Sequence, residues 1–226
     1  MTTQPNQNHA ILLGAGGHAK VVLSLARALG WDVVGVCDPA LTAALDPQEW
    51  HGVRVLGTDA ALAAFDVSTV VLLNGVGQIP GSGVRERLFE EWSARSFRFP
   101  TLVHPSASVD PSASLDEGAQ VMAGAVVQAD ARIGRNTIVN TRASIDHDSV
   151  IGAHVHIAPG ATLCGSVGVG DGAYIGAGAT VVQGLQIGRG AFLTAGALLT
   201  CNLREAGRWP SREVTRSPGI SQEQDK

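Results

Sequence analysis

A six-residue period in aliphatic residues fills the second half of the chain. Every sixth residue from Val103 to Leu199 is Val, Ile or Leu. A run of this length has a chance probability on the order of 10^-10, so the period must reflect structure. The positions are Val103, Val109, Leu115, Val121, Val127, Ile133, Val139, Ile145, Ile151, Ile157, Leu163, Val169, Ile175, Val181, Ile187, Leu193 and Leu199.

A second period accompanies the first. Small residues, with few exceptions, follow each aliphatic residue by four positions, as at Ala107, Ala125 and Ala143, and glycines cluster between them. Six residues are too few for a helical hairpin and do not fit the 3.6-residue period of an amphipathic helix. They fit a short strand and a tight turn, in which the large residue enters the core and Gly or Asn takes the strained turn conformation. The pattern therefore predicts a stack of short strands from Val103 to Arg204.

Length and charge limit what the rest of the chain can be. The chain has 226 residues, of which 45% are hydrophobic, so it can hold two domains, which we place at 1–102 and, with a C-terminal tail, at 103–226. A net charge of -4 without a basic run disfavours nucleic acid and an anionic membrane as partners. The first ten residues are polar and no segment has eighteen consecutive apolar residues, so we expect a cytoplasmic protein.

The first domain begins with a predicted strand, glycine turn and helix. Apolar residues 10–13 lead into the sequence GAGGHAK and a helix predicted over 21–29, followed by a strand at 33–36 that ends near Asp38. A helix N-terminus of this kind offers free N–H groups to a phosphate, and Asp38 could accept a ribose hydroxyl. The alternative is that the glycines only allow close packing of a helix on a strand. We predict a small parallel Rossmann-like α/β domain that binds one nucleotide through Gly14, Gly16, Gly17, His18 and Asp38.

Further strands are predicted at 53–56, 69–73 and 98–103. The strand at 69–73 ends at Asn74 and Gly75, and ligands bind at strand ends in parallel sheets. Asn74 and Gly75 are therefore candidate substrate contacts. Arg85 and Arg87 fall on the helix that follows, where a charged side chain is usually solvated.

The combination of these features resembles a known family. The sequence GAGGHAK, the α/β region and the repeat segment Asn140-Thr141-Arg142-Ala143-Ser144-Ile145-Asp146-His147-Asp148 are similar to bacterial nucleotide-sugar N-acetyltransferases and sialic acid O-acetyltransferases, over nearly the whole chain. The resemblance implies a left-handed parallel β-helix with three hexads per coil, so that residues about 18 apart stack. It also implies a homotrimer that uses acetyl-CoA to acetylate the 4-amino group of a UDP- or GDP-linked 4-amino-4,6-dideoxy sugar.

One histidine of the repeat lies between two acids. His147 is flanked by Asp146 and Asp148, either of which could hold its tautomer. An imidazole with an unperturbed pKa of ~6.5 can take a proton near neutral pH. Transfer of an acetyl group from a thioester to an amine needs such a base, together with a positioned thioester and a donor for the developing oxyanion. The chemistry of His147 therefore suits a general base.

The resemblance assigns roles to individual residues. It implies that His147 is the general base, that Asp148 is its acidic partner, and that Asn140 and His156 line the acetyl-CoA site. Gly165 follows His147 by three hexads, so one coil would bring its N–H beside the imidazole. The family directs an N–H at this place to the thioester carbonyl.

Two other classes of function fit parts of the sequence. A zinc carbonic anhydrase would use three histidines, and His147, His154 and His156 fall in a short span. His154 and His156 share one hexad, however, and the first domain would have no role, so we expect no metal site and interpret His154 as a surface residue. A non-catalytic sugar-nucleotide sensor would bind without turnover. Among enzymes the closer rival is a sialic acid O-acetyltransferase.

The C-terminus departs from the family pattern. The family commonly closes on a Gly-x-Pro-Ala segment near the CoA, whereas this chain has Ser-Pro-Gly-Ile at 217–220. We therefore assign no CoA contact to 205–226. The last residues, 222–226, are expected to be disordered.

Overall fold

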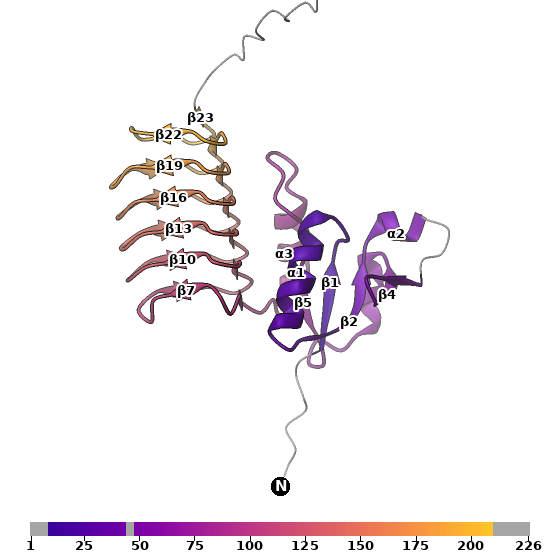
Figure 1. The fold of residues 1–226 in the computed structure, drawn as a ribbon. Coiled ribbons are helices and arrows are strands. Elements are labelled where there is room, and N and C mark those ends of the chain that lie inside the picture. Colours follow the sequence, from indigo (N-terminus) through magenta and orange to yellow (C-terminus); the bar gives the residue numbers. More distant parts are fainter. Residues whose placement is uncertain (1–8, 44–47, 210–226) are drawn as a thin grey trace, which may run out of the picture.

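The computed structural model of the chain describes residues 9–43 and 48–209. An α/β domain lies beside a tall stack of coils, and the chain enters the stack at its lowest coil (Figure 1). Two predictions concern residues outside this description: the disorder expected for 222–226, and the segment 217–220 that differs from the family's Gly-x-Pro-Ala.

The first domain is a five-stranded sheet of order β3-β4-β2-β1-β5, in which all neighbours are parallel except β3 and β4. Its elements are β1 (His9–Leu13), α1 (Gly17–Ala28), β2 (Asp32–Cys37), α2 (Pro39–Ala43), β3 (Glu49–Trp50), β4 (Val53–Gly57), the 3-10 helix η1 (Asp59–Ala64), β5 (Val71–Asn74) and α3 (Val84–Ala94). Apolar layers cover both faces of this sheet. Residues of α1 pack on one face, and residues of α3 and η1 pack on the other.

Two boundaries differ from those predicted. Helix α1 begins at Gly17 and not at 21, so the last glycine of the GAGG turn already belongs to the helix. The strand predicted at 98–103 does not join the sheet of the first domain. Only β6 (Leu102–Val103) forms there, and it pairs with the second domain, because the parallel register with Val121 satisfies its backbone.

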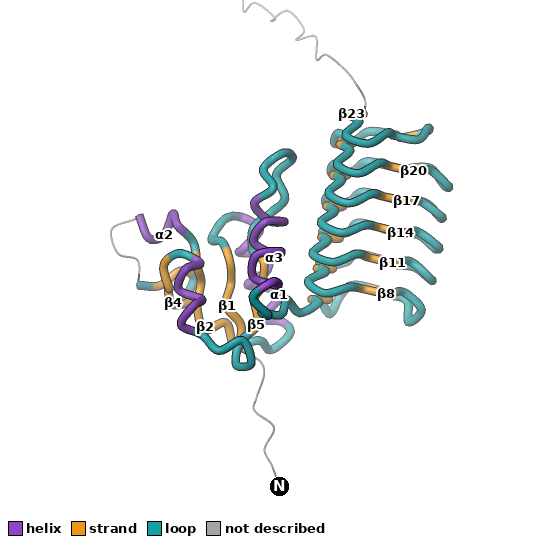
Figure 2. The backbone as a smooth tube through the Cα atoms, turned by 180° about the vertical axis from the view of Figure 1, so that it is seen from behind, coloured by secondary structure: helices purple, strands orange, loops and turns teal. Residues whose placement is uncertain are grey.

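The second domain is a parallel β-helix with three sheets, as Figures 1 and 2 show from opposite sides. The docking sheet contains β6, β9 (Gln120–Val121), β12 (Ile138–Val139), β15 (His156–Ile157), β18 (Tyr174–Ile175), β21 (Phe192–Leu193) and β23 (Arg208–Trp209). The β7 sheet contains β7 (Ser108–Val109), β10 (Val126–Val127), β13 (Ser144–Ile145), β16 (Thr162–Leu163), β19 (Thr180–Val181) and β22 (Leu198–Leu199). The β8 sheet contains β8 (Ser114–Leu115), β11 (Arg132–Ile133), β14 (Val150–Ile151), β17 (Gly168–Val169) and β20 (Gln186–Ile187).

The strands within each sheet of the β-helix pair in a register of one full coil, or three hexads, as in Ile145 beside Leu163. The second residue of each strand from β6 to β22 is one of the predicted aliphatics and points into a single continuous core. Small residues such as Ala125 and Ala143 fill the corners of that core. Burial of this column stabilises the coil, because each aliphatic side chain removed from water contributes ~1.5 to 3 kcal/mol.

Turn residues take the left-handed backbone conformation at regular places. Glycines do so, and Asn136, Asp148 and His154 do so as well, at φ of 55°, 58° and 56°. A different column requires glycine for another reason. Gly134, Gly152, Gly170 and Gly188 occupy the same position in successive coils, and a Cβ on Gly134 would meet the carbonyl carbon of Gly152 at 2.5 Å.

The first domain docks through the β5 edge of its sheet onto the docking sheet (Figure 2). Met122 and Ile138 of the β-helix join the apolar layer beneath α1. Polar bonds complete the contact: Asn74 Nδ2 donates to Asn136 Oδ1 at 3.2 Å, and Gln120 Nε2 donates to the Asn74 carbonyl at 2.9 Å. The end of β5 is thereby fixed against the coil.

Across residues 9–43 and 48–209, no helix is both long and apolar enough to cross a membrane. The cytoplasmic location expected from the sequence stays a prediction.

We predict that Gly134→Ala lowers the free energy of unfolding by more than Gly178→Ala does. The added methyl at 134 overlaps backbone atoms of the next coil, and overpacking of this kind costs typically ~1 to 3 kcal/mol or more. Gly178 has φ +65° and open space around its Cβ position, so alanine there carries only the cost of the left-handed conformation, about 1 to 2 kcal/mol. Urea unfolding of both variants measures the difference; equal losses would contradict the stacking described here.

Candidate active site

The glycine turn leaves the N-terminus of α1 open. Gly16, the residue before the helix, is extended and provides no side-chain cap, and nothing lies within 4 Å of the Cβ positions of Gly16 and Gly17. Gly14 has φ +89°, a conformation that favours glycine. Free N–H groups at a helix end attract anions.

Asp38 holds this turn from the end of β2. Its Oδ2 accepts a hydrogen bond from Ala15 N–H at 2.6 Å, and its Oδ1 accepts one from Ala40 N–H at 2.7 Å. Both carboxylate oxygens therefore bind backbone, and each keeps lone-pair capacity for a further donor. The predicted ribose contact by Asp38 would add to this role.

Asn74 and Gly75 lie at the end of β5, as the sequence predicts, but the Asn74 side chain is only 2% exposed. Its Nδ2 also donates to the Arg85 carbonyl at 3.0 Å, and its Oδ1 accepts from Val76 N–H at 3.3 Å. Gly75 lets the loop approach β1, because a Cβ there would meet the Leu13 carbonyl oxygen at 2.8 Å. The hydrogen bonds of the Asn74 side chain thus serve the contact between the domains.

Arg85 is not solvated, which corrects the expectation from its place on a helix; the side chain is 3% exposed. Its Nη1 donates to the carbonyls of Asn74 and Val76 at 2.9 and 2.8 Å, and its Nε donates to the Asn136 carbonyl at 3.2 Å. Burial lowers the pKa of Arg85 to about 9. This guanidinium clamps the loop after β5 onto the β-helix.

Three histidines lie along this contact, and an amide of the β-helix faces each of them. His18, at the second position of α1, places Nε2 2.9 Å from Gln120 Oε1 of β9. Burial, and then the charge of Arg85, lower the pKa of His18 to about 3. His18 is therefore neutral near neutral pH.

His154 is buried, at 6% exposure, so its interpretation as a surface residue was wrong. Its Nδ1 lies 2.9 Å from Asn136 Nδ2, and its Nε2 lies 3.0 Å from Glu90 Oε1 of α3. Burial lowers the pKa of His154, against the opposing charges of Glu86 and Glu90. The residue joins the two domains.

His156 faces the same side from β15. Its Nε2 lies 3.1 Å from Asn140 Nδ2, and Asn140 Oδ1 accepts from Thr141 N–H at 2.7 Å. Burial and the charge of Arg85 lower the pKa of His156 to about 4. Asn140 and His156, both assigned to acetyl-CoA on the resemblance, therefore lie together.

His147 lies on the corner between the β7 and β8 sheets. Its Nδ1 is 2.7 Å from Asp148 Oδ2, while Asp146 Oδ1 accepts from the His147 N–H at 2.8 Å. The hydrogen bond to Asp148, and then the charge of Asp146, raise the pKa of His147. Because the carboxylate can only accept, Nδ1 carries the proton and Nε2 keeps the lone pair.

Gly165 stacks one coil after His147, on the same corner. A Cβ at Gly165 would lie 2.6 Å from His147 Nε2, so a side chain at 165 would displace the imidazole from this position. The Gly165 N–H donates no hydrogen bond to a residue within 9–43 or 48–209. It stays available to an acceptor beside the ring.

The structure therefore divides the predicted site residues into two groups. Gly14, Gly16, Gly17, His18, Asp38, Asn74, Gly75, Asn140 and His156 gather around the docking sheet and the domain that covers it. His147, Asp148 and Gly165 lie on the corner opposite that sheet. His147, His154 and His156 do not converge, and in the described part of the chain no group of three potential ligands could hold a metal ion.

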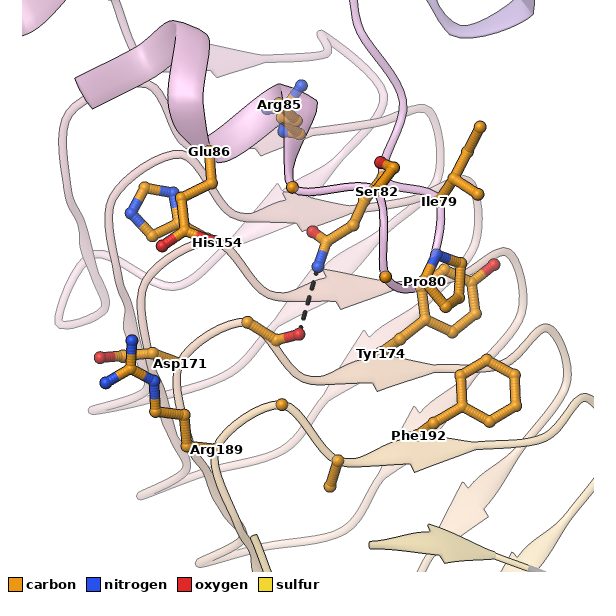
Figure 3. A pocket seen from close by; sticks show the side chains of 16 residues that line it. Ile79, Pro80, Ser82, Arg85, Glu86, His154, Asp171, Tyr174, Arg189 and Phe192 are labelled. Carbon is orange, nitrogen blue, oxygen red and sulfur yellow. Dashed lines mark hydrogen bonds between the residues drawn. The ribbon is translucent and has the colours of Figure 1, made fainter. Parts of the chain in front are cut away.

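A cavity of about 340 Å³ lies between the loop 78–83 and the docking sheet (Figure 3). Gln78 and Gly172 both line it, and Gln78 Nε2 donates to the Gly172 carbonyl at 3.3 Å. Pro80 and Tyr174 both line the cavity, and the Tyr174 ring lies edge-on to that of His156, with 5.0 Å between the ring centroids. The cavity thus adjoins the histidine assigned to acetyl-CoA.

Sequence reasoning missed Gln120, Asn136, Arg85 and Glu90, which join the domains. The sequence did contain one indication of this contact. Asn136 and His154 are three hexads apart, so a coil of that length stacks one on the other. Nothing in the sequence indicated which outward residues the first domain would cover.

Comparisons with known proteins match both domains. The model of the PglD N-terminal domain matches residues 9–91, and that of the bacterial transferase hexapeptide (six repeats) matches residues 130–165. No curated protein matches the chain.

Several solved structures are similar over most of the chain. The acetyltransferase domain of PglB from Neisseria gonorrhoeae FA1090, in complex with acetyl coenzyme A, is 35% identical with a TM-score of 0.82, covering 90% of this chain and 96% of that chain. PerB from Caulobacter crescentus, in complex with CoA and GDP-perosamine, is 36% identical with a TM-score of 0.79, covering 88% and 92%. WeeI from Acinetobacter baumannii AYE shares the fold at 23% identity and a TM-score of 0.76, covering 88% and 94%. The predicted left-handed parallel β-helix is thereby confirmed.

The buried histidines generate a prediction about stability and pH. His156 is neutral in the folded chain because its pKa is lowered to about 4, whereas in the unfolded chain it titrates near ~6.5. The unfolded state therefore binds more protons between these values, so stability present above pH ~6.5 is lost as the pH falls toward 4.

Urea unfolding between pH 8 and pH 4.5 measures this loss. We expect His156→Gln to reduce the slope of unfolding free energy against pH below 6.5 by as much as ~1.4 kcal/mol per pH unit. His51→Gln, on an exposed turn, serves as the control. A slope that His156→Gln leaves unchanged would contradict the burial of a neutral imidazole.

Proposed function

Because the chain belongs to the family of nucleotide-sugar acetyltransferases that join a PglD-type domain to a hexapeptide β-helix, we propose that it acetylates the 4-amino group of a nucleotide-linked 4-amino-4,6-dideoxy sugar. That the chain is an acetyl-CoA-dependent sugar N-acetyltransferase follows from its likeness to the PglB domain and PerB. The acceptor is linked to GDP or UDP, and the GDP-perosamine bound to PerB makes a GDP sugar the first to test.

The observation that carries the mechanism is the geometry of His147. Its Nδ1–H donates to Asp148, so Nε2 is the nitrogen that can take a proton. In the proposed reaction the sugar amine forms a bond to the acetyl carbon, the C–S bond breaks, and His147 Nε2 takes the proton that the amine loses. Asp148 holds the imidazole in this tautomer and stabilises its charged form.

Gly165 fits the proposed acetyl-CoA site. Acetyl-CoA would supply the acetyl thioester, whose carbonyl oxygen gains negative charge during the transfer. The Gly165 N–H has no acceptor within the described residues and lies beside His147, so it can donate to that oxygen. Asn140 and His156 would line the rest of this site.

The first domain supplies the proposed sugar-nucleotide site. The open N-terminus of α1 at Gly16 and Gly17 favours phosphate oxygens, and Asp38 can accept from a ribose hydroxyl. Gly14 and Gly75 allow the two loops to lie close together, and Asn74 holds them against the coil. His18 would contact the sugar.

We also propose that the site forms between copies of the chain in a homotrimer. In a single chain His18, Asn140 and His156 gather at the docking sheet, whereas His147 lies on the opposite corner of the coil. A symmetric ring lets the corner of one copy face the docking sheet of the next. The two groups of residues then complete one site.

The test of the function offers the purified protein acetyl-CoA with GDP-perosamine, with UDP-linked 4-amino sugars and with free sialic acid. Consumption of thioester with a nucleotide-linked amino sugar, and a product acetylated on nitrogen, would support the proposal. Turnover with sialic acid alone would replace it with O-acetylation, and thioester stable with every acceptor would leave only binding.

We predict that His147→Ala lowers kcat by ~10^2 to 10^4, as expected for the loss of a general base. His147 is exposed and packs no core, so the thermal unfolding temperature should stay near that of the wild type. Steady-state kinetics and thermal unfolding measure the two effects. Turnover near the wild-type level would remove His147 from its role.

A second prediction concerns pH. The raised pKa of His147 keeps the base protonated at low pH, so kcat/KM should rise with pH through that pKa. Asp148→Ala removes the larger cause of the shift and should move the acidic limb of the profile to lower pH. Asp146→Asn, which removes only the smaller cause, should move it less. An acidic limb that stays in place in Asp148→Ala would argue against His147 as the titrating base.

A further inference from the structure

The orientation of the Gln120 side chain is fixed from the side of the first domain. Gln120 projects from β9 into the contact and is 2% exposed. Its Nε2 lies 2.9 Å from the Asn74 carbonyl oxygen. A carbonyl can only accept, so the amide nitrogen faces Asn74 and the amide oxygen faces the other way, toward His18.

This orientation determines where His18 carries its proton. Gln120 Oε1 can only accept, and it lies 2.9 Å from His18 Nε2. His18 Nε2 must therefore be the N–H, and in the neutral ring Nδ1 keeps its lone pair. Within 9–43 and 48–209, Nδ1 has no hydrogen-bond partner.

The surroundings of His18 keep the ring neutral. Burial and the charge of Arg85 lower the pKa of His18 to about 3, so at neutral pH the ring is a poor base and a hydrogen-bond acceptor at Nδ1. An acceptor lone pair attracts O–H and N–H groups and repels the oxygens of a phosphate. The groups proposed above to bind phosphate at this turn are instead the free N–H groups of α1.

We propose that Gln120 is a positioning residue that holds His18 as the Nε2–H tautomer, so that His18 Nδ1 accepts a hydrogen bond from a hydroxyl or amino group of the sugar and not from the diphosphate. The inference rests on the proposed function for the identity of the ligand. Through Gln120 of β9, the β-helix would then contribute to recognition of the sugar. The first domain thus binds the acceptor fully only while docked on β9.

The first measurement reads the tautomer in the wild-type protein and uses a variant only to assign the signals. Long-range proton–nitrogen NMR of the free, nitrogen-15-labelled protein distinguishes a protonated ring nitrogen from a bare one, and His18→Gln identifies the signals. We expect a protonated Nε2 and a bare Nδ1 that do not titrate between pH 5 and pH 8. A proton on Nδ1, or a mixture of tautomers, would overturn the proposal.

The second measurement separates the sugar from the diphosphate. We expect GDP-perosamine to shift the His18 Nδ1 signal and GDP alone to leave it in place, with the UDP-linked 4-amino sugar and UDP tested in the same way. An equal shift with the nucleoside diphosphate would show that His18 contacts the phosphates and would overturn the proposal.

Gln120→Met tests the positioning role, because it keeps the length of the side chain and removes both hydrogen bonds. We expect mixed His18 tautomers and a KM for the nucleotide sugar raised roughly 5- to 30-fold, with the KM for acetyl-CoA within about twofold. Gln186→Met, on the exposed β8 sheet, is the matched control and should match the wild type.

An unchanged tautomer and an unchanged KM in Gln120→Met would overturn the role of Gln120. If that variant fails to fold, the wild-type spectrum decides the tautomer. If the wild type acetylates no nucleotide sugar, the proposed function fails, whereas the spectrum of the free protein still decides whether Gln120 sets the state of His18.

Discussion

The stacking of each strand on the strand one coil later is the constraint from which the rest of the structure follows. Parallel pairs such as Ser144 with Thr162 and Ile145 with Leu163 turn a linear sequence into columns. One column places Gly165 above His147, and another carries Gln120, Ile138 and His156 outward on the docking sheet. A residue's position within the coil therefore determines which of the three sheets it belongs to. A shift by one hexad would move it to a different sheet.

The first domain is held against one of these columns by buried polar groups as well as by apolar contact. Arg85 carries a buried charge that no described carboxylate pairs, and such burial costs several kcal/mol unless hydrogen bonds offset it. Three backbone carbonyls accept from it, and they belong to both domains. These bonds favour a single docked arrangement, because a small displacement would leave the guanidinium without acceptors. The loops that would hold a nucleotide are thereby fixed relative to Asn140 and His156.

The repeat architecture could be predicted from the sequence, because each aliphatic at a period of six has one possible place, inside the coil. The neighbourhood of His147 and Gly165 followed from their spacing of 18 residues only together with the three hexads per coil that the family resemblance implies. The docking of the domains could not be predicted: Arg85 looks like any charged helix residue, and Gln120 and His154 look like ordinary outward positions. Their burial depends on contacts between segments far apart in the chain, such as Gln120 with His18, which no local pattern encodes. The prediction that 98–103 would join the first sheet was wrong for the same reason: β6 pairs with β9 of the coil, a segment distant in the sequence.

The proposed homotrimer requires that one site takes His147 from one copy of the chain and the docking sheet, with its covering domain, from another. Mixed oligomers test it most directly. His147→Ala, expected to lose most turnover, and His18→Ala, expected to bind the nucleotide sugar weakly, are unfolded together, refolded at equal concentrations and assayed for acetyl transfer at a sugar concentration below the wild-type KM. Random assembly of a symmetric ring should restore about a quarter of the wild-type rate, because that share of interfaces joins two intact halves. No recovery beyond the separate variants, in oligomers shown to contain both chains, would mean that each site lies within a single chain and would contradict the account.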